Sequence, residues 1–155
     1  MTGSGPARVA VARVEGVEVG AVEAAVSRAM DEIRWEEAMP APEGSLFVKL
    51  NCMSGEPMPG TCTSPWVVKG FLAKVRERFP RLKIRLGDAD GYSVRQVEAY
   101  MKNWGVDKIC AEYDADAVNL SKVPTQRVRI GPCLLYTSDA ADDLLCVDLG
   151  GRRII

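Results

Sequence analysis

The chain has 155 residues, of which 47% are hydrophobic and 26% are charged, and its formal net charge is -1. These values are typical of one soluble globular domain, and the near-neutral charge gives no electrostatic basis for binding nucleic acid or a membrane surface. Histidine is absent, which excludes a Ser-His-Asp triad, a Cys-His dyad and every histidine-containing metal site.

The N-terminal part of the chain predicts a lead-in, a strand and a helix. Residues 1–7 are expected to be a flexible lead-in, and they lack the basic-then-apolar pattern of a secretion signal. With no apolar run long enough to span a membrane, we expect a cytoplasmic protein. Residues 8–14 alternate apolar and polar side chains, which predicts a first strand. Apolar residues then recur at helical spacing from about residue 19 to about residue 36.

Residues 45–50 form an apolar run interrupted only by Lys49, which predicts a buried strand. An unpaired buried charge is costly, so Lys49 has two interpretations. Its ammonium lies in water at the mouth of the strand, or it points into the crevice where open α/β sheets bind ligands. Asn51 follows the strand, either as a ligand-binding residue or as a simple turn residue.

A long loop, residues 52–63, connects this strand to a second helix. Connections of this kind are usually about two to six residues, and longer ones tend to carry function. Ser64 and Pro65 are typical of an N-cap and a first helical residue, and the helix is predicted to run to about Arg78. Its start can bind an anion, although the loop lacks the phosphate-loop pattern.

Residues 82–86 alternate as a third strand, and Gly87-Asp88-Ala89-Asp90-Gly91 follows directly. Two carboxylates at the end of a strand can bind a cation or accept a proton. Alternatively, they belong to a turn in which Asp side chains accept hydrogen bonds from nearby backbone N–H groups.

The rest of the chain continues the alternation of helices and strands. Residues 93–96 read as a capping box that starts a third helix, which Gly105 ends. A short helix over 106–113 and strands over 117–120 and 127–130 follow. This order predicts a layered α/β sandwich with a mostly parallel sheet and right-handed crossovers.

Three cysteines precede residue 133, namely Cys52, Cys62 and Cys110, and none forms a CxxC pair. The spacing argues against a zinc or iron–sulfur site in this part of the chain, and we predict no metal site. Plain loop cysteines are the favoured interpretation of Cys52 and Cys62, and a redox pair is the alternative.

Three short motifs carry a resemblance to a known family. Lys49-Leu50-Asn51-Cys52 resembles the Lys-Pro-Asn-Leu signature of the domain of unknown function 362 family. Thr63-Ser64-Pro65 is similar to its Thr-Asp-Pro helix start, and Gly87-Asp88-Ala89 to its Gly-Asp-Ser turn. Leu50 and Ser64 depart from the family pattern. The resemblance covers roughly residues 8–130 and implies an uncharacterised domain that commonly continues into a ferredoxin-like segment with iron–sulfur cysteines.

The last part of the sequence resembles translated sequencing-library adapter. Residues 133–138 read Cys-Leu-Leu-Tyr-Thr-Ser, the translation of the mosaic-end adapter of transposon-based libraries, and residues 139–143 continue it. Residues 146–155 match the distal adapter in the same frame. We therefore expect a partial α/β domain over 8–132, truncated at its C-terminus, and a non-native tail over 133–155.

Both strand-end turns are expected at one edge of the sheet, because parallel strands end on the same side. The predicted crevice is lined by Lys49, Asn51, Thr63, Ser64 and Asp88. In the first hypothesis it is a ligand-binding or catalytic site of a redox-linked protein, where Lys49 holds a small anionic group and Asp88 acts as a base or cation ligand. The alternatives are a non-enzymatic docking module for an electron-transfer domain and an inactive truncated fragment. The cofactor is unknown.

Overall fold

The computed structural model describes residues 8–16, 18–39, 41–56, 58, 60–91 and 96–124. The chain divides into residues 1–122 and residues 123–155, and the fold given below is that of the described residues of the first unit. The expected lead-in (1–7), most of the capping box (93–95), the strand over 127–130 and the adapter-like tail (133–155) lie outside the described residues. These predictions therefore stay predictions.

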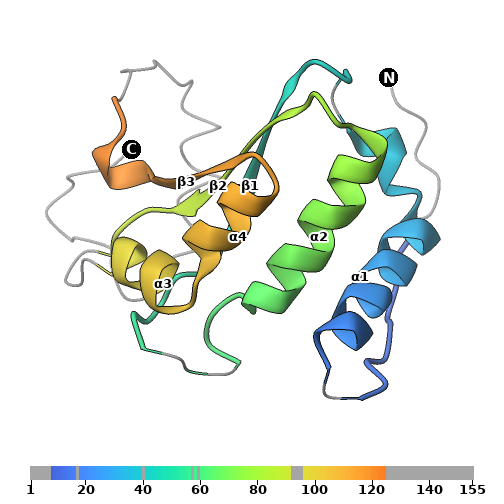
Figure 1. The fold of residues 1–155 in the computed structure, drawn as a ribbon, viewed down its shortest axis with the longest axis horizontal. Coiled ribbons are helices and arrows are strands. Elements are labelled where there is room, and N and C mark those ends of the chain that lie inside the picture. The colour runs from blue at the N-terminus through green and yellow to red at the C-terminus, as the bar shows by residue number, and fades with distance from the viewer. Residues whose placement is uncertain are drawn as a thin grey trace, which may run out of the picture. The chain divides into compact units, whose positions relative to one another are not determined.

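Helices and strands alternate along the first unit (Figure 1). In chain order they are helix α1 (Val19–Ile33), the 3-10 helix η1 (Trp35–Ala38), strand β1 (Ser45–Lys49), helix α2 (Pro65–Arg78), strand β2 (Lys83–Asp88), helices α3 (Val97–Asn103) and α4 (Val106–Glu112), strand β3 (Ala115–Asn119) and the 3-10 helix η2 (Leu120–Lys122). Among the described residues, no helix is long and apolar enough to cross a membrane.

The three strands form one parallel sheet in the order β1-β2-β3. Helix α2 connects the first pair, and α3 with α4 connects the second. Both connections lie on the same face of the sheet, as two crossovers of one hand in one direction must (Figure 1). Helix α1 packs beside α2 in the helical layer. The predicted α/β fold with a parallel sheet is confirmed.

The hydrophobic core lies between this sheet and its helices. Its most deeply buried side chains come from both layers: Leu72, Leu82, Val75, Leu86, Val97, Tyr100, Val106 and Cys110. Leu46 and Val48 of β1 pack against this cluster, whereas Phe47 between them is 43% exposed. The alternation places one face of β1 against the helices and the other away from them.

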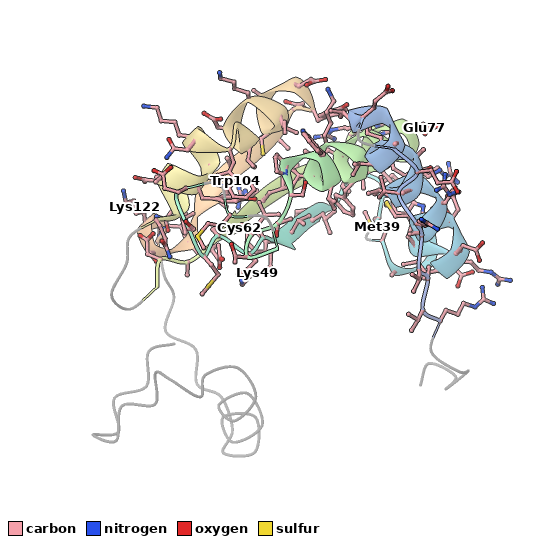
Figure 2. The ribbon with its side chains drawn as sticks, turned by 90° about the horizontal axis from the view of Figure 1, so that it is seen from below. Met39, Lys49, Cys62, Glu77, Trp104 and Lys122 are labelled. Atoms are coloured by element: carbon pink, nitrogen blue, oxygen red, sulfur yellow. The ribbon has the colours of Figure 1, made fainter. Side chains whose placement is uncertain are left out.

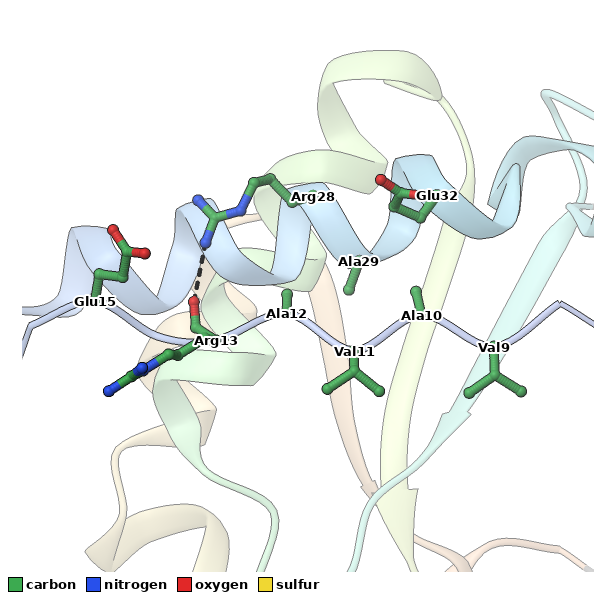
Figure 3. A pocket seen from close by; sticks show the side chains of 9 residues that line it. All are labelled: Val9, Ala10, Val11, Ala12, Arg13, Glu15, Arg28, Ala29 and Glu32. Atoms are coloured by element: carbon green, nitrogen blue, oxygen red, sulfur yellow. Dashed lines mark hydrogen bonds between the residues drawn. The ribbon is translucent and has the colours of Figure 1, made fainter.

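The predicted first strand is wrong. Residues 8–15 are extended but pair with no strand in the described part of the chain, and they run along helix α1 instead (Figure 3). Ala10 and Ala12 face the helix, and Val9 and Val11 point away from it. The alternating pattern correctly indicated an extended chain with two unlike faces. The face that carries the small alanine side chains, however, lies against a helix rather than beside a strand.

Other boundaries differ from the prediction by a few residues. Helix α1 ends at Ile33 because Arg34 adopts a left-handed conformation (φ 55°), and a separate 3-10 turn follows. Helix α3 begins at Val97 rather than Ser93. Gly105 has φ +70° and separates α3 from α4, as predicted for a residue that ends a helix.

Gly87 of β2 lies close to the backbone of β3. A Cβ built on Gly87 would lie 1.9 Å from the backbone oxygen of Val118, which is paired with it in the sheet. No side chain fits there unless the two strands move apart. The position therefore requires glycine for space rather than for an unusual backbone conformation.

We expect Gly87→Ala to lower the free energy of unfolding by about 3 kcal/mol, because the methyl group forces β2 and β3 apart. Gly20→Ala is the matched control. A Cβ at Gly20 meets nothing within 4 Å, and alanine in a helix gains up to about 1 kcal/mol over glycine. Urea unfolding of both variants makes the measurement. Equal stability of the two would contradict the close approach.

Candidate functional site

The carboxyl ends of β1 and β2 bring Lys49 and Asp88 together, as the sequence predicted. Lys49 pairs with Gly87 in the parallel register, and the Leu50 N–H donates to the Gly87 carbonyl at 2.8 Å, which continues the pairing past the end of β1. The Lys49 ammonium lies 2.9 Å from Asp88 Oδ1 and also donates to the Leu50 carbonyl at 3.0 Å. The Lys49 side chain is nevertheless 63% exposed.

Asp88 is the only buried charged residue in the described part of the chain, with 9% of its surface exposed. Its Oδ2 accepts a hydrogen bond from the Cys52 N–H at 3.0 Å, and its Oδ1 accepts one from its neighbour Ala89 at 2.8 Å. With Lys49 these are three donors around one carboxylate. Such bonds offset the cost of burying the charge and fix the carboxylate in place.

Asn51 and Thr63 join the end of β1 to the start of α2. The Asn51 N–H donates to Thr63 Oγ1 at 2.8 Å, and the Thr63 N–H donates to the Asn51 carbonyl at 3.0 Å. The Asn51 side-chain amide donates to the Thr61 carbonyl at 2.7 Å. Two of the predicted ligand-binding residues therefore bond each other across the neck of the loop.

Ser64 occupies the N-cap position of α2, and Pro65 is the first helical residue, as predicted. The Ser64 hydroxyl makes no capping hydrogen bond, however. The backbone N–H groups of the first turn of α2 are thus left without a side-chain acceptor from their own N-cap. The capping interaction expected from the sequence is wrong in this detail, although the helix start is right.

Helix α3 holds the loop from the other side, which sequence reasoning missed. The Tyr100 hydroxyl, on a fully buried side chain, donates to the Thr63 carbonyl. Asn103 donates to the Gly55 carbonyl at 2.9 Å, and a Cβ at Gly55 would lie 2.8 Å from the Ala99 side chain. Tyr100 belongs to the hydrophobic core, and no local sequence pattern indicates its hydrogen bond.

Asp90 belongs to a turn network next to Asp88. Its carboxylate accepts hydrogen bonds from the Val97 N–H at 3.2 Å and from the Asn119 side chain at 2.9 Å. Its own N–H donates to Ser121 Oγ at 2.8 Å. These contacts agree with the turn interpretation for Asp90. They also tie the end of β2 to the start of α3 and the end of β3.

Two thiols near the core are held in their neutral form. Burial, together with the negative charge of Asp88, raises the pKa of Cys52 to about 12, although Lys49 opposes the shift. Burial raises the pKa of Cys110 to about 11, with Asp107 and Asp116 adding to the shift. Within the described ranges, no group of three or more Cys, Asp or Glu side chains is arranged to hold a metal ion.

Comparison with known proteins gives one family. The profile of the family described as "Domain of unknown function (DUF362)" matches residues 46–149. The match includes all five predicted site residues and runs on into the segment that resembles adapter, whose origin stays a prediction. No significant match exists among the curated proteins, and none among the solved structures.

The contacts predict unequal effects at Lys49 and Asp88. Asp88→Asn should cost about 2 kcal/mol of stability, because a buried carboxylate with charge-assisted hydrogen bonds is lost. Lys49→Met should cost less than about 1 kcal/mol, since its ammonium is largely solvated. Urea unfolding at neutral pH measures both. A larger loss for Lys49→Met would contradict Asp88 as the anchor.

The raised pKa of Cys52 predicts a loss of stability at high pH. The thiol has a pKa of 9.0 in the unfolded chain, whereas in the folded chain its pKa is about 12. Cys52 therefore adds stability that is fully present below pH 9 and falls as the pH rises toward 12, by up to about 1.4 kcal/mol per pH unit. In Cys52→Ala this part of the slope should vanish in unfolding curves between pH 8 and 11. An unchanged slope would be the contrary result.

Proposed function

The chain belongs to the DUF362 family, and from that premise we propose that it is a binding module for a small anionic group at the carboxyl edge of its parallel sheet. The observation that carries the proposal is an exposed ammonium held at a fixed position. Lys49 is anchored by Asp88 at 2.9 Å, yet its side chain remains 63% exposed. An ammonium has three donors, and Asp88 with the Leu50 carbonyl accounts for two.

The start of α2 supplies a second attraction for an anion. The backbone N–H groups of a first helical turn and the positive end of the helix dipole favour negative charge. Because Asn51 bonds Thr63, the end of β1 that carries Lys49 lies beside this helix start. One side of the anion site is then formed by Lys49 and Asn51 at the end of β1, and the other by Thr63 and Ser64 at the start of α2.

Asp88 has a positioning role in this proposal. Both of its carboxylate oxygens already accept hydrogen bonds, and Oδ1 also pairs with Lys49. A base or cation ligand would have to give up some of these contacts. We therefore assign Asp88 to holding Lys49 and the Cys52 backbone. A link to an iron–sulfur segment, implied by the family resemblance, is the finer form of the proposal.

The sheet face turned away from the helices favours the second candidate, a docking module for an electron-transfer domain. Phe47, Arg85 and Asp116 occupy one row of the sheet register, and all three are exposed. Arg85 Nε lies 3.7 Å from Asp116 Oδ2. An exposed aromatic ring beside a charged pair resembles the composition of a protein contact surface.

Inorganic phosphate tests the first candidate directly. We expect titration with phosphate at constant ionic strength, monitored by NMR, to shift the amide signals of Trp66 and Val67 at the start of α2. In Lys49→Gln the affinity should fall at least about tenfold, because the fixed ammonium is lost. Chloride at the same ionic strength should not reproduce the shifts.

Lys83→Gln is the matched control, since Lys83 is an exposed lysine at the opposite end of the same sheet, paired with Ser45. It should bind phosphate as the parent does. Equal weakening in both variants would mean that only net charge matters, and the site assignment would fail. No binding by the parent would leave the docking candidate, for which exchange broadening at Phe47 with a reduced ferredoxin is the readout.

A further inference from the structure

Two cysteines, Cys52 and Cys62, lie at the two ends of the loop that follows β1. Asn51 and Thr63 are joined by two hydrogen bonds, one of them between their backbones. Cys52 and Cys62 are the next residues inward from this bonded pair, and Cys62 packs against the hydrophobic cluster to which Cys52 belongs. A disulfide requires Cα atoms about 4.4–6.8 Å apart, and the hydrogen-bonded pair next to the two cysteines brings the ends of the loop together.

The surroundings keep both cysteines at this position. The Cys52 backbone is held by Asp88, and its side chain is buried with 4% of its surface exposed. The Cys62 sulfur lies 3.7 Å from the Ser54 carbonyl, and Cys62 is partly exposed. Figure 2 shows Cys62 and Lys49 in the same region of the structure. The charge of Cys62 also acts on the Cys52 thiol and contributes to its raised pKa, which places the two sulfurs within electrostatic reach.

We propose that Cys52 and Cys62 form a redox-active dithiol that a small-molecule disulfide converts into an intramolecular disulfide closing the loop over residues 52–62. Cys62 is the attacking residue because its sulfur is accessible, and Cys52 is the resolving residue. The proposal does not rest on anion binding, since it requires only the two thiols and their fixed positions.

The reaction balances with oxidised glutathione as the oxidant. The Cys62 thiolate attacks one glutathione sulfur, forms a mixed disulfide and releases one glutathione thiolate. The Cys52 thiol then loses its proton to solvent, and its sulfur attacks Cys62 Sγ and releases the second glutathione. Two electrons pass to glutathione, and the two thiol protons end on the two glutathione products. The high pKa of Cys52 makes the second step the slower one.

The full chain, diluted and equilibrated with glutathione at a series of reduced-to-oxidised ratios, gives the test. After acid quenching, denaturation and alkylation, trypsin releases residues 50–69, which contain both cysteines, and residues 109–122, which contain Cys110. We expect the first peptide to lose the mass of two hydrogens while the second stays alkylated. The ratio of reduced to oxidised glutathione at which half of the protein carries the disulfide (the midpoint) should be about tenfold higher in buffer than in urea, because folding holds the thiols together.

Cys110→Ser is the control variant and should leave the midpoint unchanged, since Cys110 lies in α4 and takes no part in the reaction. Three results would overturn the proposal. The first is two alkyl groups on residues 50–69 at every ratio. The second is oxidation that stops at glutathione bound to Cys62, and the third is the same midpoint in buffer and in urea. The last comparison needs no variant and so does not depend on how a substituted chain folds.

Discussion

The structure depends on one buried carboxylate. Asp88 ends the central strand, and its two oxygens bind the backbone of Cys52 and of Ala89 while its charge pairs with Lys49 of the neighbouring strand. A carboxylate with so little exposure is tolerated only where donors surround it. The loop after β1 must therefore pass over the end of β2. That requirement fixes the exit of β1 and, through Asn51 and Thr63, the start of α2.

The parts of this arrangement that were predictable from the sequence carry strong local signals. Pro65 marks the start of α2, which the structure places at Pro65–Arg78, and the apolar run before Lys49 marks β1. The meeting of Lys49 and Asp88 followed from a general property of parallel sheets, whose strands end at one edge. The strand predicted over residues 8–14 was wrong because alternation of apolar and polar residues specifies an extended chain but does not specify whether its neighbour is a strand or a helix.

The remaining parts of the site depend on contacts that no local pattern contains. Tyr100 is a fully buried residue of α3, and its hydroxyl donates a hydrogen bond to the Thr63 carbonyl. Asn103 looks like a solvated helix residue and holds the Gly55 carbonyl instead. Both contacts exist only because the crossover places α3 beside the loop. Ser64 is the opposite case. Serine is a favourable N-cap residue and occupies the N-cap position of α2, but its side chain makes no capping hydrogen bond.

The span of these contacts has a consequence for folding kinetics. The hydrogen bond from Cys52 to Asp88 joins residues 36 positions apart, and the bonds from α3 to the loop join residues 37 and 48 positions apart. Closing chain segments of this length costs entropy before any contact is gained, and such contacts form late and slowly. Helical turns depend on contacts between near neighbours in the chain, whereas the edge with Lys49 and Asp88 assembles only when β1 and β2 have paired. Access of solvent to the Cys52 amide is therefore coupled to opening of the whole sheet rather than to movement of its loop alone.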